Sequence, residues 1–141
     1  MNSYEVLKEK ISKKYNDFPF IVAFTNADLH EKLEKRKLTI PDIVQVMPGT
    51  FIAKSDSGKL KELIKWADNA RQEAINNDSD GSGYIKEMFE YELWNHEYGY
   101  TYDLDDTLNA LGLTLEKVKA DKKLDNGLQL ALKKYREQWE G

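Results

Sequence analysis

A polar loop between two expected helices has the ligand spacing of a calcium site. Gly81 falls at position 6 of a twelve-residue calcium loop, where glycine permits a sharp turn. Calcium prefers hard oxygen ligands, so the loop predicts a calcium-binding helix-loop-helix module as one hypothesis. The oxygens at the ligand positions would come from Asn76, Asp78, Asp80, Ser82 and Glu87.

Two features of this loop argue against calcium. Position 1 is Asn76 instead of aspartate, which removes a charge from the site. Position 8 is Gly83, where an apolar side chain normally pairs with a second loop, and the sequence contains no second loop of this kind. The alternative is a polar connection whose Asp, Asn, Ser and Gly residues serve its turns.

Segment 78–106 combines negative charge with aromatic side chains. Nine acidic residues and one basic residue give it a net charge of −8, although the whole chain carries only −4, and it contains seven of the 16 aromatic residues. Protein-binding surfaces use such aromatic anchors for contact and charge for steering. We therefore predict that this segment contacts a protein partner. The expected contact residues are Glu90, Tyr91, Trp94, Glu97, Tyr98, Tyr100, Tyr102 and Asp103.

The same segment also permits a purely structural interpretation. In this alternative the side chains of Phe89, Trp94 and Tyr98 belong to the hydrophobic core. The carboxylates are then solvated or cap helices, where negative charge is favourable near the first turn.

A third hypothesis is an enzyme whose acidic and basic side chains converge only in three dimensions, using Glu92, His96, Glu97 or Asp103. Glu92 and His96 are four residues apart and share a helix face, but two ligands do not make a metal site. Residue 100 is tyrosine, so the second histidine of a zinc-protease motif is absent.

Other catalytic templates are missing, so no catalytic residue is assigned. The chain has no cysteine, which excludes disulfides, thiol nucleophiles and cysteine metal sites. Residues 57–60 resemble part of a phosphate loop but lack its final hydroxyl and its upstream glycine. Short basic runs are interleaved with glutamate, which argues against direct binding of nucleic acid. Apart from the calcium hypothesis, no cofactor is expected.

Hydrophobic spacing predicts mixed structure in the first half of the chain. A helix is expected over about 3–16, a short buried strand over 20–24, and a second helix after a cap at Asn26. The runs 43–47 and 51–54 are strand-like and flank a Pro-Gly-Thr turn, which predicts a β-hairpin.

The second half is expected to contain helices only. These run from Ser55 or Asp56 to about 76, from about 84 to 96, from Asp103 to Gly112, from Thr114 through Val118, and from Asp125 or Asn126 onward. The aromatic stretch 98–102 has no clear assignment. The order predicts a single α+β domain over 1–141, with a three-stranded sheet that includes a hairpin and a helix-rich C-terminal half.

No targeting or membrane segment is expected. The first residues lack the apolar core of a secretory signal. The most apolar run, 18–24, is far shorter than the roughly 20 residues that a membrane helix needs. The sequence therefore predicts a cytoplasmic protein without membrane contact.

One stretch of sequence resembles a known domain family. Residues 95–108, followed by Leu-Gly-Leu-Thr at 111–114, are similar to the C-terminal signature of a small uncharacterised family found in phages and mobile elements of Gram-positive bacteria. Residues 51–56 are similar to the middle section of that family. The resemblance implies no activity, and the loop 78–83 is not part of the shared pattern.

The favoured hypothesis is a non-enzymatic accessory protein of phage or mobile-element type, which binds a protein partner through segment 78–106. In one version it is an anti-defence (anti-CRISPR-like) inhibitor. A carboxylate-rich surface would then occupy the basic channel of a host nucleic-acid-binding protein, such as an RNA-guided nuclease. The oligomeric state is left open.

Overall fold

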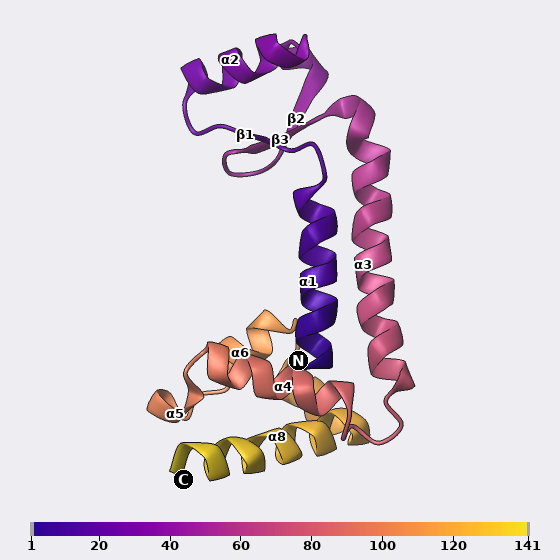
Figure 1. Cartoon of the computed structure of the whole chain (residues 1–141), viewed down its shortest axis with the longest axis vertical. Coiled ribbons are helices and arrows are strands. Elements are labelled where there is room, and N and C mark those ends of the chain that lie inside the picture. Colours follow the sequence, from indigo (N-terminus) through magenta and orange to yellow (C-terminus); the bar gives the residue numbers. More distant parts are fainter. Residues whose placement is uncertain (1, 141) are drawn as a thin grey trace. The chain divides into compact units, whose positions relative to one another are not determined.

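The computed structural model describes residues 2–140 and has the expected α+β fold, with a three-stranded antiparallel sheet and a helix-rich C-terminal half (Figure 1). Contacts divide the chain into two compact units. One unit combines the start of the chain through Lys10 with the stretch from Asn69 onward, and the other comprises Ile11–Asp68. The boundaries fall inside two helices, α1 (Ser3–Asn16) and α3 (Ser57–Asn77), and each contributes residues to both units.

The sheet lies in the unit Ile11–Asp68. Its strands are β1 (Ile21–Val22), β2 (Ile43–Met47) and β3 (Thr50–Ala53), and β3 is the central strand. The predicted hairpin is confirmed, since β2 and β3 pair antiparallel around Gly49, whose φ of 72° suits glycine. The first strand is shorter than expected because the Phe20 amide donates locally to the Phe18 carbonyl (2.8 Å).

Three helices precede, separate and follow the strands along the chain. They are α1 (Ser3–Asn16), α2 (Asn26–Arg36) and α3 (Ser57–Asn77), with 3-10 turns η1 (Ile40–Asp42) and η2 (Lys54–Asp56). The cap of α2 is Thr25 and not Asn26, because the Thr25 hydroxyl accepts the Asp28 amide at 3.1 Å. Leu29 and Leu33 of α2 are buried in one cluster with Ile21, Ala23 and Ile43 of the sheet segments.

The other unit contains the C-terminal helices. They are α4 (Tyr84–Asn95), α5 (Tyr98–Thr101), α6 (Asp105–Ala110), α7 (Leu115–Ala120) and α8 (Lys122–Glu140). Helix α4 packs along α8 (Figure 1), and Phe89 and Leu128 are fully buried in the core between them. Gly127 allows the close approach, because a Cβ atom there would lie 2.4 Å from a methyl carbon of Ile85.

Two elements in this unit differ from the sequence prediction: α8 begins earlier than predicted, and the stretch 98–102, which had no assignment, contains a helical turn. Helix α8 begins at Lys122, before the predicted caps at Asp125 or Asn126, because Asp121 Oδ1 accepts the amides of Lys123 (2.9 Å) and Leu124 (3.2 Å). The unassigned aromatic stretch forms the single turn of α5. None of the helices in the described part of the chain is long and apolar enough to cross a membrane.

Candidate functional site

Aromatic rings from three elements meet around one buried tyrosine. Tyr135 of α8 is 2% exposed, and its ring centroid lies 4.4 Å from that of Trp94 and 5.5 Å from that of Tyr98. Rings that touch at such separations stabilise one another beyond the area they bury. We call this group the aromatic cluster. It consists of Trp94 from α4, Tyr98 and Tyr100 from α5, Tyr102, and Tyr135 and Trp139 from α8.

Four rings of the aromatic cluster are open to solvent. The exposed fractions are 43% for Trp94, 73% for Tyr100, 65% for Tyr102 and 38% for Trp139. A contiguous group of exposed aromatic side chains is unusual on a protein surface, and such groups mark interaction sites. The cluster is therefore a surface with a buried anchor, not a closed core.

The position of α5 in this cluster depends on Gly99. Its amide donates to the Tyr135 hydroxyl at 2.7 Å, and a Cβ atom at this residue would lie 2.6 Å from two ring carbons of Trp139. The two residues that flank α5, Glu97 (φ 53°) and Tyr102 (φ 56°), adopt the left-handed conformation. Each costs about 1 kcal/mol relative to the right-handed region, so packing must hold this turn in place.

Exposed carboxylates flank α5 at both ends. Glu97 is its N-terminal cap residue, and Asp103 follows Tyr102, the C-terminal cap residue. Asp103 also accepts the Asp105 amide at 2.8 Å, at the start of α6. No lysine or arginine occurs from residue 87 to residue 116. We call the exposed carboxylates Glu97, Asp103, Asp105 and Asp106 the acidic rim.

Two other carboxylates of segment 78–106, Glu90 and Glu92, are engaged inside the protein, whereas Asp80 is exposed. Glu90 Oε1 lies 3.5 Å from Lys86 Nζ and 3.4 Å from Lys134 Nζ. Glu92 has a side chain that is only 1% exposed. Apart from Asp80, the fully exposed carboxylates of the segment therefore belong to the acidic rim, a narrower region than the sequence indicates.

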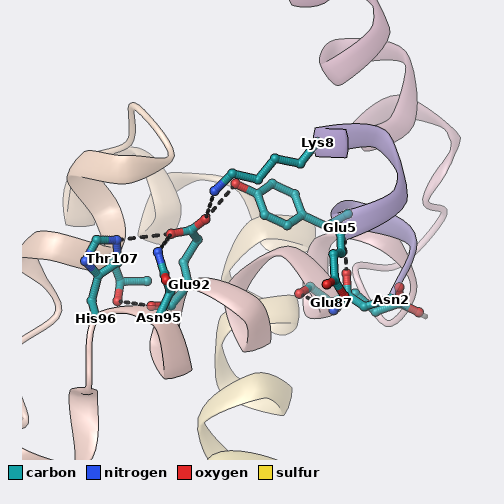
Figure 2. Close-up of polar contacts among 9 residues, drawn as sticks. Asn2, Glu5, Lys8, Glu87, Glu92, Asn95, His96 and Thr107 are labelled. Carbon is teal, nitrogen blue, oxygen red and sulfur yellow. Dashed lines mark hydrogen bonds and ion pairs between the residues drawn. The ribbon is translucent and has the colours of Figure 1, made fainter. Parts of the chain in front are cut away.

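Glu92 is the buried centre of a polar network between α1 and α4 (Figure 2). Its Oε1 accepts the Tyr4 hydroxyl at 2.9 Å and the Lys8 ammonium at 3.0 Å. Its Oε2 lies 3.1 Å from His96 Nε2 and accepts the Asn95 amide at 3.4 Å. A buried carboxylate is stable only when it is paired in this way.

The network shifts the pKa of two of its members. Burial raises the pKa of Glu92, but hydrogen bonds from Lys8 and Tyr4 outweigh that effect, so the pKa lies below its ordinary value of 4.5. Burial raises the pKa of Tyr4, and the hydrogen bond to the Glu92 carboxylate raises it further. A deprotonated Glu92 and a neutral Tyr4 together hold α1 against α4.

The four residues of the enzyme hypothesis are only partly brought together. Glu92 and His96 are in contact, whereas Glu97 and Asp103 are exposed at the two ends of α5. Sequence reasoning missed Tyr4 and Lys8, which lie 88 and 84 positions from Glu92 along the chain. The only available signal was their spacing of four residues, which places both on one face of α1.

The loop residues with calcium-ligand spacing form separate hydrogen bonds. Asp78 caps α4, because Oδ1 accepts the Gly81 amide (2.9 Å) and Oδ2 accepts those of Gly83 (3.1 Å) and Ile85 (3.0 Å). Asp80 Oδ1 accepts the Ser82 amide and hydroxyl at 2.9 and 2.6 Å.

The remaining two predicted ligands point elsewhere. The Glu87 carboxylate accepts the Ser3 amide and hydroxyl, and Asn76 Oδ1 accepts the Gln72 side-chain amide at 2.9 Å. Among residues 2–140, no group of three or more His, Asp or Glu side chains is placed to hold a metal ion.

The predicted contact residues divide into two sets. Trp94, Glu97, Tyr100, Tyr102 and Asp103 are exposed, and Tyr98 is half-buried in the aromatic cluster. Tyr91 instead packs on Tyr4, with ring centroids 5.4 Å apart, and Glu90 pairs with lysines. Tyr135 and Trp139 of α8 join the site, although they lie outside the segment in which the sequence predicted it.

A family model described as a family of unknown function, DUF7659, matches residues 3–134. This confirms that the sequence resembles an uncharacterised domain family. The matched range includes α5 and the acidic rim but ends before Tyr135 and Trp139. No curated protein matches the chain, and no solved structure matches it either.

Proposed function

We propose that this chain, which belongs to the DUF7659 family, binds a protein partner through the aromatic cluster and the acidic rim. The observation that carries the proposal is the exposure of four aromatic rings around the buried Tyr135. Tyrosine and tryptophan supply large, rigid contact area with few rotatable bonds, so they lose little entropy on binding.

The geometry favours a binding role over catalysis. The Glu92 carboxylate is occupied by contacts that join helices, the hydrogen bonds from Tyr4 and Lys8, and by His96. The Tyr100 side chain of α5, in contrast, is 73% exposed and so is accessible to a partner. We therefore propose a non-enzymatic accessory protein.

The partner that this surface fits is a basic protein. The acidic rim lies in a stretch without lysine or arginine, so its field attracts positive surfaces and accelerates encounter. We propose a phage or mobile-element protein that acts against host defence. It would cover the nucleic-acid channel of a host protein such as an RNA-guided nuclease.

Affinity capture with the full chain tests partner binding. The bait is compared with the double variant Tyr100→Ala/Tyr102→Ala, using lysate of a Gram-positive host. The matched control is Phe24→Ala, which removes a ring that is 80% exposed in the unit Ile11–Asp68. We expect a partner that the wild type and Phe24→Ala retain and that the double variant loses. Equal retention by all three baits would contradict the proposal.

An inhibition assay tests the anti-defence role separately. The purified chain is added to an RNA-guided nuclease from such a host, and binding of target DNA is measured. We expect inhibition that weakens in Glu97→Gln/Asp103→Asn and falls as salt rises, because salt screens exposed charges. If saturating protein leaves DNA binding unchanged, this role is wrong for that nuclease, although partner binding is still tested by capture.

A further inference from the structure

We propose that the aromatic cluster and the acidic rim recognise an arginine side chain of the partner, in preference to lysine. This inference rests on the proposed function and specifies its chemistry. It follows from the combination of exposed ring faces and exposed carboxylates around one short helix.

The aromatic cluster and the acidic rim together favour a cation that binds aromatic rings. Tyr100 and Tyr102 are the most exposed members of the aromatic cluster. Asp103 follows Tyr102 directly, and Glu97 lies three residues before Tyr100. Aromatic faces carry negative charge density that attracts cations, and nearby carboxylates add to that attraction. The same chemistry occurs within this molecule, where Lys8 Nζ lies 5.0 Å from the ring centroid of Tyr91 and 3.0 Å from Glu92 Oε1.

Arginine fits this arrangement better than lysine. A guanidinium group is planar and weakly hydrated, so it stacks on a ring while its edge donates hydrogen bonds to carboxylates. Helix α5 has four residues and is therefore about 6 Å long, so Glu97 and Asp103 lie on either side of the single turn that carries Tyr100. A lysine ammonium is compact and strongly hydrated, so it lies over a ring as a point charge, as Lys8 does over Tyr91, and has no planar face to stack.

Contacts within the chain hold α5 and the Tyr100 ring in place before any partner arrives. The Gly99 amide is hydrogen-bonded to the buried Tyr135 hydroxyl, and the ring centroid of Tyr100 lies 5.0 Å from that of Trp139 in an edge-to-face contact. Preorganised side chains lose less entropy on binding, which favours a single well-defined cation over diffuse charge attraction.

Calorimetric titration of the full chain with three peptides tests the inference. The peptides have identical length and Gly-Ser spacing, and they carry arginine, lysine or the neutral isostere citrulline. We expect the arginine peptide to bind about tenfold or more tightly than the lysine peptide, because only guanidinium gains the stacking contact. We expect no measurable binding of the citrulline peptide.

Variants locate the binding site. Tyr100→Ala and Asp103→Asn should each weaken the arginine peptide about tenfold. Phe24→Ala and Asp42→Asn should leave its affinity unchanged, since they remove an exposed ring and an exposed carboxylate in the unit Ile11–Asp68.

The outcomes separate this inference from the proposed function. Equal affinity for arginine and lysine peptides, or no binding of the arginine peptide at millimolar concentration, overturns arginine recognition. If capture still depends on Tyr100 and Tyr102 in that case, partner binding stands. If capture does not depend on those rings, the proposed function itself is wrong.

Discussion

Glu92 shows how one buried carboxylate joins parts of the chain that are distant in sequence. Its oxygens contact Tyr4 and Lys8 from α1 and His96 from the end of α4. An isolated charge in this position would be costly, because burial removes its hydration. The network therefore stabilises the docking of the first turns of α1 only while the carboxylate is ionised and paired.

Removing the charge of Glu92 should destabilise the protein. We expect Glu92→Gln to lower the free energy of unfolding by about 1–3 kcal/mol, because its donors lose a charged acceptor in a buried place. Urea unfolding followed by circular dichroism measures the change. The control Glu97→Gln alters an exposed side chain and should change stability by less than about 0.5 kcal/mol. Equal stability of both variants would contradict a structural role for the network.

The contribution of Glu92 should depend on pH in a defined direction. Its pKa in the folded protein is lower than the ordinary value of 4.5, so folding favours the ionised form. The stabilisation is fully present above about pH 4.5 and is lost as the pH falls through the lower, folded pKa. We therefore expect the stability difference between wild type and Glu92→Gln to shrink between pH 5 and pH 3.

Urea unfolding at a series of pH values measures this difference. Other carboxylates with lowered pKa, such as Asp42 and Asp80, are present in both proteins, so their contributions cancel. A difference that stays constant down to pH 3 would show that the charge of Glu92 is not the cause.

At the scale of elements, the position of α5 and the conformation of the loop before α4 each depend on a single residue. Gly99 lets α5 approach Trp139, and Asp78 receives three backbone amides at the start of α4. Neither element has the hydrophobic periodicity that specifies longer helices. Their geometry therefore depends on local contacts that one substitution removes.

A side chain at residue 99 should disrupt the aromatic cluster more than the fold. In Gly99→Ala the new Cβ would overlap the Trp139 ring, so we expect altered near-ultraviolet circular dichroism, a stability loss of about 1–2 kcal/mol, and loss of partner capture. Gly58→Ala is the control, because open space surrounds that residue in α3. Its stability should be unchanged or raised by up to about 1 kcal/mol. An unaltered aromatic signal in Gly99→Ala would contradict the close contact.

Loss of the Asp78 cap should weaken α4. We expect Asp78→Ala to lower the free energy of unfolding by about 2–3 kcal/mol, because three amides near a buried helix start lose a charged acceptor. The exposed Asp80 is the control, and Asp80→Ala should cost less than about 1 kcal/mol.

Thermal unfolding of both Asp78 and Asp80 variants and of the wild type is measured in EGTA and in millimolar calcium. We expect each protein to melt at the same temperature in EGTA and in calcium, since backbone donors already occupy the Asp78 oxygens. A calcium-dependent rise in the wild type that Asp80→Ala removes would instead support the helix-loop-helix calcium module.

At the scale of the whole molecule, the two units have hydrophobic clusters of different sizes. The unit with α4 and α8 buries a large cluster around Phe89, Leu93 and Leu128. The cluster in Ile11–Asp68 is smaller and centres on Ile21 and Leu33. Buried apolar area dominates stability, so the two units should resist opening to different degrees.

Hydrogen exchange should resolve this difference. We expect amides of α4 and α8 to exchange more slowly than those of β2 and α2 under native conditions, because local opening of the smaller cluster exposes less apolar surface. Mass spectrometry of peptic fragments measures the protection. Identical opening free energies in both units would show that the chain unfolds as one cooperative body.

Local patterns in the sequence suffice for most of the fold. The apolar spacing of α1 and α3, the turn at Gly49 and the left-handed Gly112 all involve residues within a few positions of one another, so their periodicity and turn chemistry are visible along the chain. The predicted start of α8 was wrong because Asp121, a residue nearby in the sequence, caps the helix in place of Asp125 or Asn126.

Tertiary structure decided which residues form the site. Sequence alone determined that carboxylates and aromatic residues gather between 78 and 106. It did not distinguish the buried, paired Glu92 from the exposed Glu97, and it did not show that Tyr135 anchors the rings of α4 and α5. The physical reason is that charge and ring exposure depend on contacts between distant segments, whereas helices and turns depend on hydrogen bonds between near neighbours.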